Sequence, residues 1–349
     1  MQFILISFWL VVQFIFIMNW KKYIIIPVIF VSLVLSYIVF VHDIEINPDR
    51  QNYINYVIYI VDGGTAPIEP IWYFIIYFIN FFSSAEFVHN LFIIVVALAS
   101  ILLKLMIFDK YGGSLVGCMT MYLSYYFLVY DIVQIRIGLA VCFLYLSWFR
   151  LKEQKFNTFL LYGLMATLSH LSCLIFITGL VFVSKSQSSW GEWIKRLLYL
   201  TPFAAASIFY PYYLVDSISF FANTLEIGKL IEYLGNFEND GFTRISYIRV
   251  LPYLLLLLIF LVGFKHWKHD INIILLVRIL ILGVFIFLIL SPVPVFAYRI
   301  SDMYLFSSIL LVGNACKLFK KSTYYIFVSL FTFPILIYTL MFSGLFEYE

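Results

Sequence analysis

The stretch 271–290, "INIILLVRILILGVFIFLIL", is apolar along its whole length apart from Asn272 and the charged Arg278. A run of roughly 20 apolar residues is long enough to cross the hydrocarbon core of a bilayer as an α-helix. Charged residues inside such a helix are rare and costly. The stretch therefore predicts a transmembrane helix with Arg278 buried inside it.

Runs of the same kind make up most of the chain. Of its 349 residues, 64% are hydrophobic and 12% are charged, and the mean hydropathy is +1.00. A soluble domain is nearer half apolar and a quarter charged, and a membrane β-barrel would show an alternating pattern. We predict an all-α polytopic integral membrane protein with about 12 transmembrane helices, in a range of about 10–13. The candidate spans are 3–18, 23–41, 87–108, 114–130, 132–149, 156–169, 171–184, 197–214, 248–264, 271–290, 301–316 and 324–342.

The chain is expected to form a single transmembrane domain, 1–349. The segment 70–82 is short for a span, and we expect a short or re-entrant helix there. It belongs to a first external loop, 42–86, that carries short helices, and a second, longer external loop covers 215–247. The first run lacks a basic start and a small-residue cleavage site, which favours a retained helix over a signal peptide.

Basic clusters, such as "RLKEQK" at 150–155, indicate which loops face the cytoplasm. One topology satisfies them all, with the amino terminus outside and a turn of the chain near His170. It leaves 13 of 14 lysines on or near the inside but five of eight arginines outside. A guanidinium group binds phosphate in a bidentate manner, so these arginines are expected to bind an anion. The alternative is ion pairs at helix ends, for example Arg299 with Asp302. The five outer arginines are Arg50, Arg136, Arg244, Arg249 and Arg299.

The first outer polar stretch is 42–69, "HDIEINPDRQNYINYVIYIVDGGTAPIE". A proline is favoured at the first position of a helix, so we expect a helix over 48–60 with Tyr53 and Tyr56 on one face. Glu69 is expected to cap a second helix that begins at the next proline. The alternative is an aromatic-rich amphipathic helix that only lies at the membrane interface.

Further polar groups follow in stretches 125–140 and 164–176. Asp131 and Arg136 are expected at the mouth of a span, with Arg136 five residues into its helix, roughly 7–8 Å below the start. His170 stands alone in an apolar stretch, either as a packing residue or as a group that binds phosphate or moves a proton.

Two later stretches complete the expected outer layer. The long loop 215–247 leads to Arg244 and Arg249 at the entry to the next span. In 291–306, two prolines are expected to break the helix and to present Tyr298, Arg299 and Asp302.

Several classes of function are excluded by missing motifs. The sequence has no P-loop, GxSxG, HExxH or nucleotide-binding glycine fingerprint, and no basic soluble face for nucleic acid. The four cysteines lie in apolar runs without metal-ligand spacing, and we predict no metal site. An enzyme here would use no cofactor, and its substrate would come from the membrane or from outside.

At this point the pattern resembles the EpsG-like and Wzy-type polysaccharide polymerases of bacterial inner membranes. The matching pieces agree in order and spacing: "DRQNYINY" from 49, "EPIWYFIIYFIN" from 69, "QIRIGLA" from 134, "ATLSHLSCLIF" from 166 and "FAYRISDMYLF" from 296. The resemblance implies a multi-pass inner-membrane enzyme that acts at the periplasmic face. It would transfer a growing glycan from undecaprenyl pyrophosphate to the non-reducing end of the next lipid-linked repeat unit. A chain-length regulator protein is the implied partner.

The resemblance also implies site residues. The family's arginines fall on Arg136 and Arg299, its histidine on His170, and its acidic-tyrosine motif on Asp49 and Tyr53, whereas Ile137 replaces a common Gln. His170 is the first candidate for a general base, followed by Asp49 or Glu69. The predicted catalytic set is Arg136, His170, Asp49 and Glu69, and the predicted substrate-binding set is Arg299, Arg244, Arg249, Arg50, Tyr53, Tyr56, Asp131 and Tyr298.

Three alternatives share parts of this pattern. An O-antigen ligase has a similar outer face but a different acceptor. A lipid-linked oligosaccharide flippase would carry polar groups through the middle of the membrane, where the sequence indicates only Arg278. An acyltransferase would favour a histidine with an acidic partner on the inner face, which the sequence does not indicate.

Overall fold

A computed structural model of the chain describes residues 25–41, 48–182, 199, 201–210, 216, 219 and 247–342. Several expected features lie outside the described residues. They are the span 3–18, most of the loop 215–247, Arg244 and the side chains of Asp49 and Arg50. The chain divides into two compact units, residues 1–183 with 312–349, and residues 184–311, and each is described by itself. The expected single domain stays a prediction.

All regular elements of the described residues are helical. Four of these helices are long and apolar enough to cross a membrane, and the run 271–290 is one of them. The others are Phe87–Tyr111, Leu115–Val133 and Lys321–Met341. The chain is therefore an all-helical membrane protein, and the expected number of about 12 spans stays a prediction.

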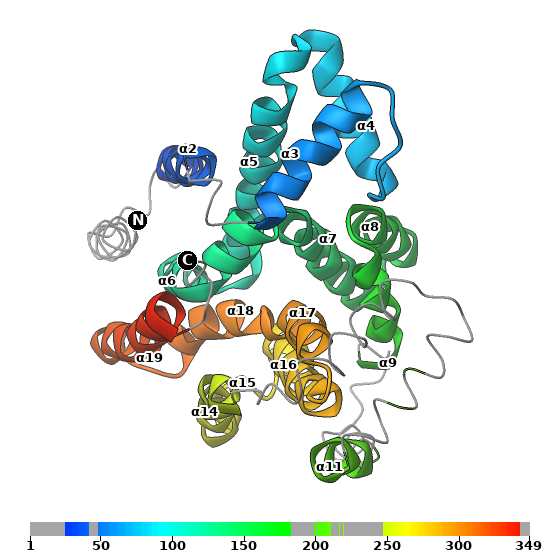
Figure 1. Cartoon of the computed structure of the whole chain (residues 1–349). Helices are drawn as coiled ribbons and strands as arrows, with labels where there is room; N and C mark the ends of the chain where they lie inside the picture. The colour runs from blue at the N-terminus through cyan, green and yellow to red at the C-terminus, as the bar shows by residue number, and fades with distance from the viewer. Residues whose placement is uncertain are drawn as a thin grey trace. The chain divides into compact units, whose positions relative to one another are not determined.

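The first unit contains most of the helices (Figure 1). Their bounds are α2 Ile25–Val41, α3 Pro48–Val61, α4 Pro70–Phe82, α5 Ala85–Tyr111, α6 Leu115–Met121, η2 Tyr122–Val133, α7 Ile135–Lys152, α8 Phe156–Ser169, η3 Leu171–Thr178, α9 Gly179–Phe182, η5 Ala315–Lys317 and α19 Lys321–Phe342. Here α6 and η2 form one continuous helix whose second half is a π-helix.

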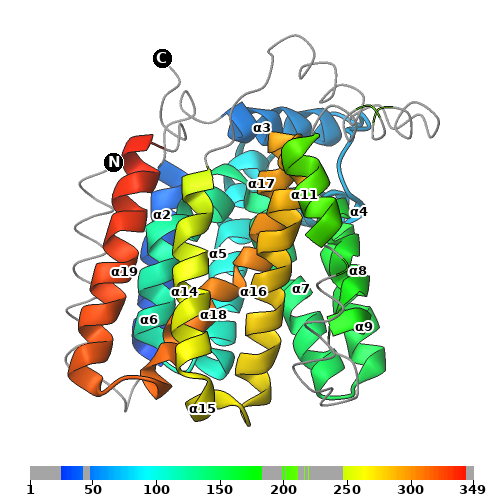
Figure 2. The ribbon, with the colours of Figure 1, turned by 90° about the horizontal axis from the view of Figure 1, so that it is seen from below.

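Helices α3 and α4 begin where their prolines predict. The helix α3 starts at Pro48, and α4 starts at Pro70 with Glu69 in the N-cap position. Proline suits the first helical turn because its missing N–H would have no helical partner there. Figure 2 shows α3 lying crosswise to α5 and α7, at one end of these helices. The expected helix 48–60 and the expected short helix at 70–82 are thus both present.

Helices α7 and α8 form an antiparallel hairpin. The Ser147 hydroxyl donates to the Phe159 carbonyl at 2.9 Å and joins the two helices beside their turn. The chain turns again at His170. After this turn η3 packs back on α8, and the ring centres of Phe176 and Phe159 lie 5.3 Å apart. Arg136, at the start of α7, and His170, after α8, therefore lie at the same end of the hairpin.

The expected depth of Arg136 is wrong. The π-helix η2 continues through Asp131 to Val133, and Gln134 separates it from α7. Arg136 is thus the second residue of α7 and not five residues inside a helix. A π-helix has wider turns than an α-helix and is often found next to functional sites.

The second unit is built around α16, Ile271–Leu290. The helices α11 (Thr201–Phe209), α14 (Leu251–Val262) and α17 (Pro294–Leu305) pack against it. The remaining elements are η4 Tyr247–Val250 and α15 Phe264–Trp267, and α18, Ser307–Asn314, crosses the boundary between the units. Arg278 is 6% exposed, which confirms its predicted burial. In 291–306, α17 begins at Pro294, so Tyr298, Arg299 and Asp302 lie on a helix.

Candidate functional site

One end of the first unit holds a compact cluster of Arg136, Glu69 and Tyr53. The Arg136 Nη1 donates to Glu69 Oε2 at 2.6 Å, and their side chains are 17% and 18% exposed. The guanidinium carbon lies 5.2 Å from the centre of the Tyr53 ring, within range of a cation–π contact. Three elements supply this cluster: α3, the start of α4 and the first turn of α7.

Each member of the cluster has a local reason for its place. Glu69 is in the N-cap position of α4 but makes no side-chain capping bond, so its carboxylate is available to Arg136. Tyr53 and Tyr56 stand one helical turn apart on α3, as the sequence predicts. They line one pocket together with Val57, Ile68, Trp72, Ile76, Phe92 and Arg136.

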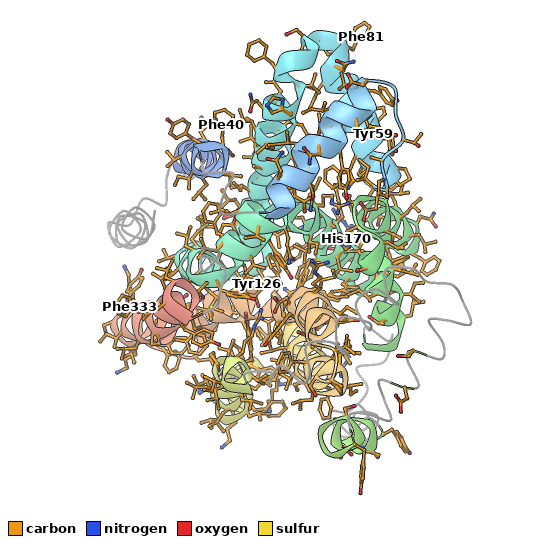
Figure 3. All side chains as sticks on the ribbon, in the orientation of Figure 1. Phe40, Tyr59, Phe81, Tyr126, His170 and Phe333 are labelled. Atoms are coloured by element: carbon orange, nitrogen blue, oxygen red, sulfur yellow. The ribbon has the colours of Figure 1, made fainter. Side chains whose placement is uncertain are left out.

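Trp72 connects this pocket to the turn at His170. It is fully buried, and its indole N–H donates to the carbonyl of Ser169 at 2.8 Å. His170 follows directly, with extended backbone, and its Nδ1 accepts from the backbone N–H of Ser172 at 3.3 Å. Figure 3 labels His170 at this turn between α8 and η3. Trp72 therefore couples the position of α4 to the turn that holds the histidine.

Arg136 keeps donor capacity for a ligand. Its Nε is buried and has no hydrogen-bond partner among the described residues. Buried donors are nearly always satisfied in native proteins, so such an atom calls for an explanation. A phosphate oxygen that reached the pocket would satisfy the guanidinium edge and compete with Glu69 for the charge.

The second unit contains a similar cluster of an arginine, a carboxylate and a tyrosine. Arg249 donates from Nη2 to Asp302 Oδ2 at 2.6 Å, and its guanidinium carbon lies 4.3 Å from the centre of the Tyr298 ring. The sequence alternative paired Asp302 with Arg299, whereas Arg249 is its partner here. Arg299 lies on α17 next to Tyr298 and is partly exposed.

A family model described as the EpsG family matches residues 25–349. The chain belongs to the EpsG family. This confirms the EpsG-like resemblance, and membership supports a polysaccharide-polymerase-like membrane protein. No curated protein and no solved structure matches the chain.

In this EpsG-family chain, Asp131 is separated from the pocket residues. Its side chain has no exposed surface, and its carboxylate forms a buried ion pair with Lys104 Nζ at 2.7 Å. It also accepts from Ser100 Oγ at 2.7 Å and from the Tyr122 hydroxyl at 2.5 Å. Its expected role in binding substrate stays a prediction, and the structure gives its carboxylate protein partners instead.

Lys104 is the residue that sequence reasoning missed. The sequence indicated Arg278 as the only deep charge, but Lys104 is also fully buried within α5. The signal was present, because a lysine inside the apolar run 87–108 is costly unless it has a partner. That partner, Asp131, is 27 residues away in the sequence, and spacing alone does not reveal it.

Proposed function

We propose that this EpsG-family protein is a membrane glycosyltransferase that polymerises lipid-linked oligosaccharides at the periplasmic face of the bacterial inner membrane. It would transfer the growing glycan from undecaprenyl pyrophosphate to the non-reducing end of the next lipid-linked repeat unit. The observation that carries this proposal is the cluster in which Arg136 is ion-paired to Glu69 and lies over the ring of Tyr53. A cation beside aromatic rings suits a ligand that joins phosphate to sugar.

The transfer needs no cofactor because the donor is already activated. An acceptor hydroxyl oxygen attacks the anomeric carbon of the donor sugar and forms the new glycosidic bond. The bond from that carbon to the pyrophosphate oxygen breaks, and the pyrophosphate leaves with the electron pair. Arg136 would stabilise the negative charge that develops on the leaving oxygen. The proton of the acceptor hydroxyl would pass to a general base.

His170 is the proposed general base. It lies at the same end of the α7–α8 hairpin as Arg136, and Trp72 joins the pocket to its turn. Neutral imidazole accepts a proton near neutral pH, which suits this role. Glu69 is less suited to it, because its carboxylate is engaged by Arg136. Asp49 stays the second candidate.

In the second unit, we propose Arg249, Arg299 and Tyr298 as groups that also bind the substrate. Arg249 and Tyr298 repeat the arginine–tyrosine contact seen at Arg136 and Tyr53. The binding roles predicted for Arg50, Arg244 and Tyr56 are part of this proposal, whereas the buried carboxylate of Asp131 already has Lys104, Ser100 and Tyr122 as partners. The proposed partners are the lipid-linked oligosaccharide, membrane lipid and a chain-length regulator protein.

The proposal is tested by Arg136→Ala and Arg136→Lys in a strain whose only polymerase is this protein. The lipid-linked glycans of each strain are separated on a gel, and the amount of each variant in the membrane is measured. We expect both variants to be present and to leave only single repeat units. Lysine should fail because it cannot form the bidentate contact with phosphate. Long polymer from the alanine variant would refute the assignment of Arg136.

A deletion strain separates this function from the two nearest alternatives. Loss of a polymerase leaves single repeats on the carrier, whereas loss of a ligase leaves long polymer on the carrier. Loss of a flippase leaves single repeats that are not accessible from the periplasmic side. Single repeats that a periplasmic glycosidase can digest in spheroplasts would therefore support polymerase activity alone.

A further inference from the structure

The buried cluster around Lys104 lies next to the first turn of α7, which carries Arg136. Lys104 Nζ donates to both carboxylate oxygens of Asp131, at 2.7 and 2.9 Å, and to Ser100 Oγ at 2.5 Å. Tyr122 completes the cluster through its hydroxyl. Ser100 and Lys104 lie one turn apart on α5, and Tyr122 and Asp131 lie on η2. The cluster thus joins α5 to the π-helix by four side chains.

Stability alone is a poor reason for this ion pair. The cost of removing two charges from water can exceed the attraction between them, and apolar residues of similar size often stabilise a protein equally well. Ionisable groups inside membrane helices are expensive and are generally functional. Where buried ion pairs have a demonstrated role, they fix one register or arrangement. Such a role requires an arrangement of elements that the Lys104–Asp131 pair could fix.

That arrangement is the junction of η2 and α7. Gln134 ends η2 by donating its N–H to the Val129 carbonyl at 2.8 Å. The first turn of α7 then packs tightly against the last turn of η2, because a Cβ at Gly138 would lie 2.4 Å from the Tyr130 carbonyl oxygen. Any shift of the η2 backbone at Asp131 would be transmitted to this turn of α7.

The same cluster is also in contact with α7 through Cys142. The Cys142 thiol lies 3.3 Å from the Gly138 carbonyl and 3.6 Å from the Ser100 carbonyl, so α7 is in contact with α5 at the cluster itself. Arg136 lies two residues before Gly138, in the first turn of α7. Its guanidinium must reach Glu69 and Tyr53, which come from other elements. The position of this turn therefore decides where Arg136 points.

We infer that Lys104 and Asp131 form a buried positioning pair that fixes the η2–α7 junction and thereby places Arg136 in its pocket. This inference rests on the proposed function for the part that Arg136 takes in the transfer. Lys104 touches no substrate in this scheme and acts only through Asp131 and the junction. The pair would be retained for geometry, because apolar replacements would keep the fold but allow the junction to move.

The main test replaces both charges, as Lys104→Met with Asp131→Leu, in the full-length protein. Four quantities are compared with the unsubstituted protein: membrane amount, Tm in detergent, kcat for polymerisation, and the rate at which a maleimide labels Gln134→Cys. We expect a normal membrane amount and an unchanged or higher Tm. We expect labelling of position 134 to become several-fold faster and kcat to fall roughly 10- to 100-fold, since a displacement of about 1 Å can cost that much.

A milder pair of variants keeps the test decisive if the double variant is not produced. Ser100→Ala removes a hydroxyl of the cluster, and Ser124→Ala removes a buried hydroxyl of η2 that donates to the Thr120 carbonyl of its own helix. We expect Ser100→Ala to change labelling and kcat in the same direction as the double variant, and Ser124→Ala to change neither. Equal effects of the two alanine variants would overturn the inference.

The labelling rate also separates this inference from the proposed function. Unchanged labelling at position 134, or unchanged kcat, in the double variant overturns the positioning role. Restored kcat in the charge-swapped Lys104→Asp with Asp131→Lys protein, relative to either single reversal, supports it. The proposed function fails by a different result, namely full polymer from Arg136→Ala with labelling of position 134 unaffected.

Discussion

At the scale of single residues, the main finding is that Glu69 and Arg136 are partners. Sequence reasoning placed both in the catalytic set and considered Glu69 as a base. The 2.6 Å ion pair between them favours a different role for Glu69 under the proposed function, in which its carboxylate would neutralise Arg136 until the pyrophosphate binds. Removing the Glu69 carboxylate is therefore expected to improve donor binding if Glu69 only neutralises Arg136, and to slow the reaction if Glu69 is a general base.

The variant Glu69→Gln is expected to lower KM for the lipid-linked donor and to leave kcat nearly unchanged. Without the carboxylate, Arg136 is free to bind phosphate, and the pocket loses a competing anion. Steady-state kinetics with purified lipid-linked repeats measure both constants. A fall in kcat of about 100-fold or more at unchanged KM would instead identify Glu69 as a general base.

The turn between α7 and α8 holds a glutamate, Glu153, with two cationic partners, Arg150 and Lys155. Glu153 is partly buried, which opposes its ionisation, but hydrogen bonds from Arg150 at 2.7 Å and Lys155 at 3.1 Å outweigh this. Together they lower the pKa of Glu153 to about 2. A lowered pKa stabilises the fold at a pH above the unfolded value, near 4.3, and this stabilisation is lost as pH falls through the folded value.

We therefore expect the Tm difference between the unsubstituted protein and Glu153→Gln to be constant above about pH 5 and to shrink from there toward pH 2. Its size should correspond to no more than about 1 kcal/mol, since the ion pairs are partly solvated. Thermal unfolding in detergent at a series of pH values measures it. A difference that grows as pH falls would contradict this assignment.

At the scale of elements, the short helix α4 is joined to the end of α8 through Trp72. Its exposed side carries Phe74, Phe78, Phe81 and Phe82, while Trp72, Ile76 and Ile79 are buried. The buried indole bond to the Ser169 carbonyl lies between the Arg136 pocket and His170. The geometry of the proposed site thus depends on a contact between elements 97 residues apart in the sequence.

The variant Trp72→Phe should lower stability by about 1–2 kcal/mol, because the Ser169 carbonyl loses its buried donor. It should also reduce polymer formation. Trp148→Phe is the matched control, since Trp148 donates to the Phe176 carbonyl at 3.1 Å near the opposite end of α7. Tm and gel analysis of glycans should show a similar loss of stability for both variants and a loss of polymer for Trp72→Phe alone. Equal loss of polymer would mean that stability explains both.

For the whole molecule, the predicted topology assigns each end of the first unit to one face of the membrane. Within the first unit, the Arg136 pocket and His170 lie at one end of the α7–α8 hairpin, and Glu153 and Lys155 lie at the other. The positive-inside rule assigns the basic turn to the cytoplasm. The pocket would then face the periplasm, where the proposed substrate is found.

Labelling of introduced cysteines tests these sides. Asp62 and Lys155 are both exposed, at the two ends of the unit, and Cys316→Ser removes the native thiol that is not fully buried. In spheroplasts, a membrane-impermeant maleimide should modify Asp62→Cys at once and Lys155→Cys only after the membrane is opened. The reverse order would place the Arg136 pocket in the cytoplasm and would refute the proposed periplasmic reaction.

The membrane class and the starts of α3 and α4 could be predicted from the sequence alone, because they depend on local properties, and the family followed from motifs along the chain. Hydropathy over about 20 residues predicts a spanning helix without reference to the rest of the chain. Prolines predicted the starts of α3 and α4 in the same local way. The shared face of Tyr53 and Tyr56 follows from helical periodicity, and the pocket confirms it.

The pairing of the charged residues became known from the three-dimensional structure. Glu69 meets Arg136 across 67 residues, Lys104 meets Asp131 across 27, and Arg249 meets Asp302 across 53. The sequence placed most of these residues in a common outer layer but assigned no such pair. Buried charges inside a membrane protein need partners wherever packing brings them together. Their pairing is set by how the helices pack and not by spacing along the chain, so the partner of Lys104 could be named only after α5 and η2 were placed side by side.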